Sequence, residues 1–166
     1  MKKVVLFFLS LIMVTNAIKA QEAPKNSNVI IIKTTENIDD SFKKVGRILI
    51  HEGYELETAD KDFYMITTKI TQKKYGLMGG GSLEVKFNIQ FDQSNDSTII
   101  KIIGFTNSAQ LATAAGLNND SFDKDAIRVQ NKGANGSIIK SSWIFMDEIA
   151  KKYMNGTISY IIEESK

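Results

Sequence analysis

The chain contains 166 residues, with no cysteine, one histidine and a formal charge of +2. A chain without cysteine has neither disulfides nor cysteine catalysis, so we expect one domain held together by an ordinary apolar core. Residues 1–20 carry three lysines and no acid, which leaves 18 basic and 19 acidic residues elsewhere and excludes the basic excess typical of nucleic-acid binding.

The first 20 residues have the three parts of a secretory signal peptide. A basic start precedes an apolar run from Val4 to Val14, and the small residue Ala20 precedes a polar stretch. The run is shorter than the roughly 20 residues of a membrane-spanning helix. We therefore expect an exported protein, periplasmic or secreted, cleaved after Ala20 or alternatively after Ala17. An uncleaved anchor is the less favoured interpretation, a lipoprotein is not expected without cysteine, and any membrane contact would be peripheral.

Residues 21–28 are polar and contain the only proline, which predicts a flexible leader before a single α+β domain over residues 29–166. The β-branched run Val29–Ile32 predicts a strand. Residues 37–52 predict a helix, because Asn37 is a good N-cap residue and apolar side chains recur every three or four positions. Gly53 supplies the left-handed residue that commonly ends a helix.

The next segments predict strands. Residues 54–58 and 63–70 read as two short strands joined by a turn at residues 60–62. Residues 83–91 alternate strictly between apolar and polar side chains, as expected for a strand with one buried and one solvated face. Residues 98–105 predict the hairpin partner of this strand.

Residues 106–137 are rich in Asn, Ala and Gly, and predict only a short helix near residues 108–115 and a short strand near residues 126–131. Residues 139–154 predict a second helix, since their apolar side chains repeat every three or four positions. Residues 157–162 alternate as an edge strand would. We therefore predict an α+β, two-layer fold: a mostly antiparallel sheet with two main helices packed on one face.

Residues 38–70 resemble a known family in the order helix, glycine, strand, turn and strand. The matching positions are Phe42, Val45, Gly46, Arg47, Leu49, Gly53, Tyr54, Leu56, Asp60 and residues 64–67. The pattern resembles the repeated domain of BamC, an accessory lipoprotein of the outer-membrane barrel-insertion machine. It is also similar to small exported Bacteroidetes proteins of unknown function with a TATA-binding-protein-like fold. The resemblance implies that fold and no catalytic residues. The chain departs from BamC in lacking a lipobox cysteine and in having one such domain instead of two.

The residues of the chain lack the types and spacing that catalysis, cofactor binding or metal binding would require, so we do not expect an enzyme. His51 is the only histidine and is expected to lie exposed at a helix end. Ser82 follows glycines but lacks the nucleophile-elbow pattern, and the same stretch lacks the lysine of a phosphate-binding loop. Three aspartates between residues 120 and 125 lack the spacing of a calcium loop and predict a solvated loop.

The glycine-rich stretch at residues 75–82 is the main interaction candidate. Tyr75, Leu77 and Met78 place large apolar side chains there. The stretch reads either as a long flexible hairpin tip or as an interaction loop that contacts a partner or a lipid surface. We expect a non-enzymatic exported envelope protein, a protein-interaction or assembly-accessory module that binds a protein partner through its sheet edges or this loop. The alternative is a small-ligand-binding domain with its site between the sheet and residues 106–137.

Overall fold

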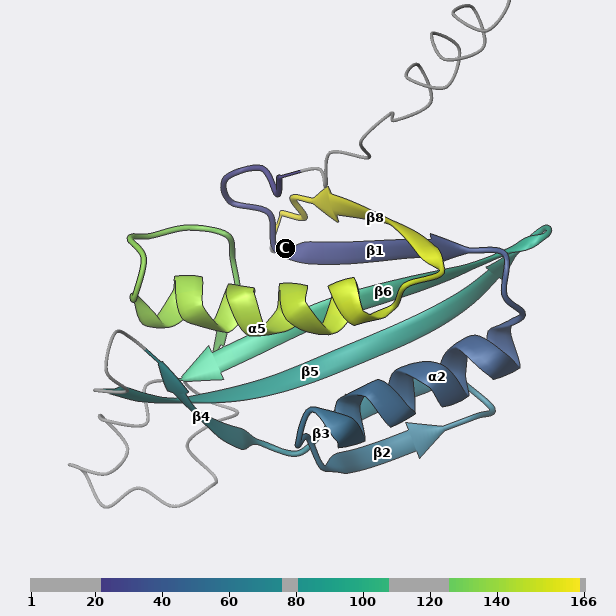
Figure 1. Cartoon of the computed structure of the whole chain (residues 1–166), viewed down its shortest axis with the longest axis horizontal. Coiled ribbons are helices and arrows are strands. Elements are labelled where there is room, and N and C mark those ends of the chain that lie inside the picture. Colours follow the sequence, from purple (N-terminus) through teal and green to yellow (C-terminus); the bar gives the residue numbers. More distant parts are fainter. Residues whose placement is uncertain (1–21, 76–80, 108–125, 165–166) are drawn as a thin grey trace, which may run out of the picture.

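The computed structural model describes residues 22–75, 81–107 and 126–164 (Figure 1). In chain order the elements are β1 (Val29–Thr34), α2 (Ile38–His51), β2 (Leu56–Asp60), β3 (Met65–Thr68), β4 (Thr71–Tyr75), β5 (Gly81–Ser94), β6 (Ser97–Asn107), β7 (Ile127–Arg128), α5 (Ile138–Lys152) and β8 (Gly156–Ile161).

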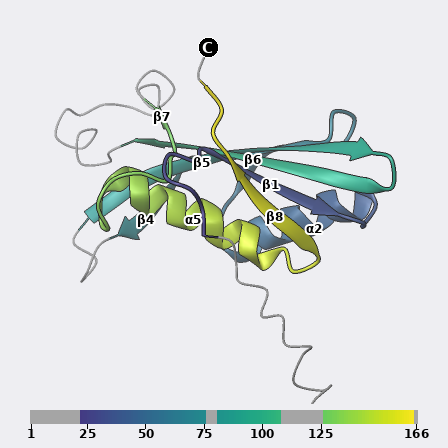
Figure 2. The ribbon, with the colours of Figure 1, turned by 90° about the horizontal axis from the view of Figure 1, so that it is seen from above.

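The eight strands form one antiparallel sheet around the long β5–β6 hairpin. Strands β3 and β4 pair with successive parts of the free side of β5, and β1 and β7 do the same along β6. Strand β2 lies beyond β3, and β8 lies beyond β1. Both helices cover the same face of the sheet (Figure 2). The predicted two-layer α+β fold is therefore confirmed.

The first helix begins and ends where the sequence predicts. The Asn37 side-chain oxygen accepts a hydrogen bond from the Asp40 backbone N–H at 2.8 Å, which satisfies one of the free donors of the first turn. Gly53 follows the helix with φ +78°, a left-handed conformation that costs glycine little. These two local signals mark the two ends of α2.

The alternating strand at residues 83–91 is the centre of the core. Its five apolar side chains face the helices, and each is at most 4% exposed: Leu83, Val85, Phe87, Ile89 and Phe91. From the helix layer, Trp143 and Met146 of α5 pack into the same cluster. Burying five such side chains contributes on the order of 10 kcal/mol before entropy is counted, so this strand anchors the sheet.

One predicted strand is shorter than expected, and a strand that was not predicted follows it. We expected a single strand over residues 63–70, but Phe63 lies in the preceding turn with 80% of its surface exposed. Asp60 fixes this turn, because its Oδ1 accepts the backbone N–H groups of Asp62 and Phe63. The chain then forms β3, bends, and adds β4 to the same side of β5.

The segment before β1 makes defined contacts with the domain. The Asn26 N–H donates to the Asn131 carbonyl at 2.9 Å, and the Asn131 N–H donates to the Ser27 carbonyl at 2.7 Å. Ser27 is fully buried and Asn28 nearly so. Part of the predicted leader thus pairs with the chain just after β7, a contact that no sequence pattern indicates.

Candidate interaction edge

The loop predicted to bind a partner is only partly described. Tyr75 is the last residue of β4, and its ring packs against the core cluster. The ring also covers Gly81, where an added methyl carbon would lie 2.5 Å from the Tyr75 Cε1 atom. Leu77 and Met78 lie outside the described residues. Tyr75 therefore supports the β4–β5 hairpin.

Residues 106–137, predicted to form one wall of a ligand site, are described only outside 108–125. The described part places Val129 in the core, fully buried against β6 and α5. A methyl group added at Gly104 would lie 3.0 to 3.2 Å from Met146, Val129 and Phe87. Packing of this density leaves no room for a ligand at Gly104, between β6 and the chain after β7.

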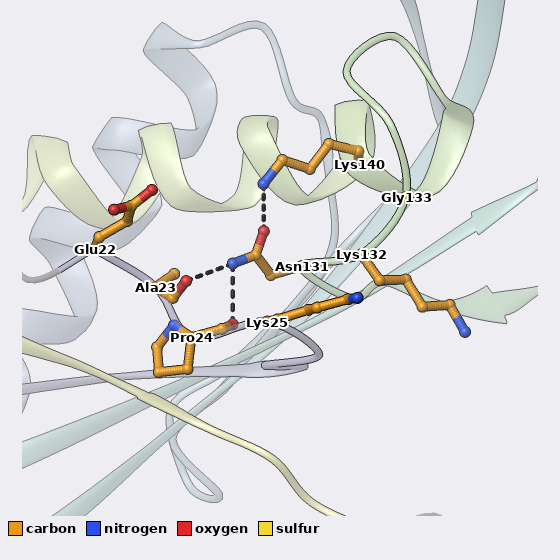
Figure 3. Close-up of a pocket in the computed structure, with 8 residues that line it drawn as sticks. All are labelled: Glu22, Ala23, Pro24, Lys25, Asn131, Lys132, Gly133 and Lys140. Carbon is orange, nitrogen blue, oxygen red and sulfur yellow. Dashed lines mark hydrogen bonds between the residues drawn. The ribbon is translucent and has the colours of Figure 1, made fainter.

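A shallow pocket of about 450 Å³ lies on the outside of the domain, between the leader and the start of α5 (Figure 3). Its lining is Glu22, Ala23, Pro24, Lys25, Asn131, Lys132, Gly133 and Lys140. The Asn131 amide nitrogen donates to the carbonyls of Ala23 and Pro24, and its oxygen accepts from Lys140. The polar groups at its centre therefore bind one another, and the two remaining lysines point away from them (Figure 3).

A polar cluster around Glu36 joins the connection between β1 and α2, helix α2 itself, and the connection between α5 and β8. The Glu36 carboxylate accepts hydrogen bonds from Lys44 at 2.9 Å, Tyr153 at 2.5 Å and Asn155 at 2.6 Å. The Tyr153 hydroxyl oxygen accepts a hydrogen bond from the hydroxyl of Ser41, which is fully buried. The hydrogen bond from Lys44, followed by those from Tyr153 and Asn155, lowers the pKa of Glu36 to about 2. This cluster therefore connects the first turns of α2 with the end of α5.

This cluster makes the fold sensitive to acid. Because the Glu36 pKa falls from 4.5 in the unfolded chain to about 2 in the fold, its contribution is complete above pH 4.5. As the pH drops from 4.5 towards 2, about 2 kcal/mol of unfolding free energy should be lost, after allowance for partial solvent screening. Urea unfolding from pH 6 to pH 2 measures the loss. Glu36→Gln should reduce the pH slope, whereas Glu55→Gln, at an exposed pair with Lys69 that solvent screens, should reduce it much less. An equal slope in both variants would contradict the assignment.

The histidine lies where the sequence predicts. The His51 side chain is 86% exposed at the end of α2, and its Nδ1 lies 3.1 Å from the Glu52 carboxylate. In the described part of the chain, no group of three or more His, Cys, Asp or Glu side chains could hold a metal ion. The geometry around His51 therefore supplies neither a metal ligand set nor a base with a second oriented partner.

The edge strands of the sheet differ in how their unpaired sides are protected, and β8 differs from the others. Among the described residues, β2, β4, β7 and β8 each pair on one side only. Proteins commonly protect such edges with charged side chains, bulges or very short strands. Strand β2 carries Glu57 and Asp60 and shifts register after Leu56, β4 carries Lys73 and Lys74, and β7 is two residues long with Arg128. Strand β8 has six residues and no charge.

Strand β8 is firmly seated on its inner side. It pairs with β1 along its whole length, from Val29 with Ile161 to Thr34 with Gly156. The Tyr160 ring lies 5.9 Å from the Trp143 ring, and the Tyr160 hydroxyl donates to Asp147 at 2.8 Å. Burial, followed by this hydrogen bond, raises the pKa of Tyr160. The strand is therefore held in place on one side, and among the described residues no strand pairs with its other side.

Exposed apolar side chains gather at the two ends of this strand. Met154, just before β8, is 87% exposed, while Ile161 and Ile162 at its far end are 42% and 58% exposed. On α5, Ile144 is 41% exposed and lies next to Trp143, which contacts β8 through Tyr160. An uncharged edge bordered by apolar side chains has the character of a protein-binding site.

Comparison of the chain with models of known protein families gave no matching family, and comparison with curated proteins gave no matching relative. Neither helix in residues 22–75, 81–107 and 126–164 combines the length and apolar character that crossing a membrane requires.

Proposed function

We propose that the chain is a non-enzymatic, exported module that binds another protein strand along the free side of β8. The observation that carries this proposal is the contrast between edges: β8 presents six uncharged residues, whereas β2, β4 and β7 each present charges. Strand addition is an established mode of recognition in which main-chain hydrogen bonds supply affinity and alternate side chains supply selectivity.

The two faces of β8 offer different contacts to an added strand. Thr157, Ser159 and Ile161 are exposed on the face away from the helices. Ile158 and Tyr160 are half-buried on the helix face and pack against the core cluster. An added strand with alternating character would therefore extend the apolar layer on one side and meet hydroxyl groups on the other.

The cellular setting of this activity is part of the same proposal. A signal peptide at residues 1–20 would export the chain to the envelope, where strand addition is useful for binding partially assembled proteins. The resemblance of residues 38–70 to BamC supports an accessory role of this kind. Ser41 and Tyr153 of the Glu36 cluster are buried, which agrees with a structural role for that cluster.

A photo-crosslinking amino acid at position 159 tests the proposal in living cells of the native host. Ser159 is exposed in the middle of β8, so a probe there should form a defined adduct with the protein that occupies the edge. The matched control is position 58, because Thr58 is exposed in the middle of β2, an edge that carries acids. An adduct at position 159 and none at position 58 supports binding at β8.

Two results would contradict the proposal. The first is an absence of adducts at position 159 under conditions where the protein is folded and abundant. The second is an equal set of adducts at positions 159 and 58, which would mean that the probes report random collisions. A further variant carries the probe at position 161 and the changes Thr157→Lys and Ser159→Lys. The two lysines protect the edge with charge, so a specific adduct should be lost.

A further inference from the structure

We infer that the occupant of the β8 edge is a second copy of this chain, paired antiparallel about a two-fold axis at Ser159. The inference rests on the proposed function, because it names the partner for the same edge. Charged and bulged edges chiefly prevent a protein from pairing with its own copies. The chain has such protection on β2, β4 and β7 and none on β8, so self-pairing is opposed everywhere except there.

The sequence of β8 is self-complementary in this register. Ser159 faces Ser159 of the other copy, Thr157 faces Ile161, and Ile158 faces Tyr160. Each contact occurs twice, as a two-fold interface requires, and no charge faces a charge of the same sign. Pairs of β-branched and aromatic residues directly across antiparallel strands are favourable. On the helix face, Ile158 and Tyr160 would continue the apolar layer from one copy into the other.

The register also determines what meets at the ends of the paired strands. In this register Ile162 of one copy lies opposite Gly156 of the other, and Met154 lies opposite Glu164. The Met154 and Ile162 side chains are 87% and 58% exposed in the single chain. The pairing therefore places these two exposed apolar side chains near the ends of the paired strands and joins the two sheets into one.

The small area of the β8–β8 contact predicts a weak association between the two copies. One six-residue strand pair with a few flanking side chains falls in the class of interfaces below about 1,200 Å², which form weak and reversible complexes. We expect a dissociation constant of roughly 10–100 µM. The dimer should thus form at high local concentration and dissociate on dilution.

Sedimentation velocity of the purified protein between 5 and 500 µM tests the inference. The expected result is a rise in mean mass from one chain towards two chains. Ser159→Lys should weaken the association at least tenfold, whereas Thr58→Lys on β2 should not change it. Circular dichroism confirms that both variants keep the fold. A single-chain mass at every concentration would overturn the inference, as would equal weakening by both variants.

The absence of cysteine allows a second test of the register. Residues directly opposite in an antiparallel pair lie about 4.5–5.5 Å apart at Cα, within the range that a disulfide spans. In Ser159→Cys, copper-phenanthroline oxidation should therefore link two copies, while Thr58→Cys should remain unlinked. No link in Ser159→Cys would overturn the two-fold axis at Ser159.

The solution mass and the cellular crosslinking result together distinguish failure of this inference from failure of the proposed function. If the protein stays a single chain in solution but the probe at position 159 captures a different protein in cells, the edge binds strands and the partner is not a second copy. If the purified protein dimerises through Ser159 and the cellular adduct has twice the mass of one chain, both hold. If neither a dimer nor an adduct forms, both fail.

Discussion

Replacing Phe87 with alanine is expected to lower the free energy of unfolding by about 3–5 kcal/mol. Phe87 is fully buried in the middle of β5, and its ring lies 5.2 Å from the Tyr54 ring in an edge-to-face contact. The change removes the ring, leaves a cavity and ends this aromatic contact. Urea unfolding followed by circular dichroism measures the loss.

The matched control for this change is Phe63→Ala. Phe63 is 80% exposed in the turn before β3, so the same substitution there should alter the unfolding free energy by less than about 0.5 kcal/mol. A loss below 1 kcal/mol for Phe87→Ala would show that β5 does not direct this side chain into the core. Comparable losses at both positions would contradict the exposed turn.

Gly104→Val is expected to lower the unfolding free energy by about 3 kcal/mol, because β6 has no room for a side chain at this position. An added Cβ would lie 3.0 Å from the Met146 sulfur, 3.1 Å from Val129 and 3.2 Å from Phe87. The two further methyl groups of valine would displace these neighbours and separate α5 from the sheet. Thermal unfolding of the variant measures the effect.

A glycine in the first helix provides the contrasting control. Gly46 is buried in α2, but an added Cβ would meet its nearest atoms at 3.9 and 4.0 Å, an ordinary contact distance. Gly46→Ala should therefore raise the unfolding free energy by up to about 1 kcal/mol, since alanine favours the helix. Destabilisation by Gly46→Ala together with tolerance of Gly104→Val would mean that the two layers pack differently.

The elements predicted from sequence are those whose signals are local. The cap at Asn37, the left-handed Gly53 and the strict alternation at residues 83–91 each act within one element, and all three are confirmed. The edge strand near residues 157–162 is confirmed as β8 for the same reason. Its lack of charge was readable from the sequence, but the contrast with other edges required the pairing order.

Strand β4 was missed because its inward side chains are not an apolar series. Thr71, Lys73 and Tyr75 pair in register with the core-facing side of β5. The Lys73 ammonium lies 4.2 Å from the centre of the Tyr54 ring and donates to the Glu52 carbonyl, so the lysine stem covers core surface while its charge stays satisfied. An apolar alternation therefore does not reveal β4, because one of its core-facing side chains is a lysine.

The Glu36 cluster was invisible in the sequence because its partners are distant along the chain. Tyr153 and Asn155 lie 117 and 119 residues from Glu36, and only the fold brings them together. A glutamate just before a helix reads as an ordinary surface residue. Long-range polar contacts of this kind depend on the topology, which sequence periodicity does not specify.

The position of β1 between β6 and β8 has a consequence for folding during synthesis. During synthesis, β1 must keep one side open until β6 exists and the other until the six residues of β8 have been made. Pairings this distant in sequence are slow to form and cannot be completed on a growing chain. During synthesis β1 would therefore lack one of its two neighbours until β8 has been made.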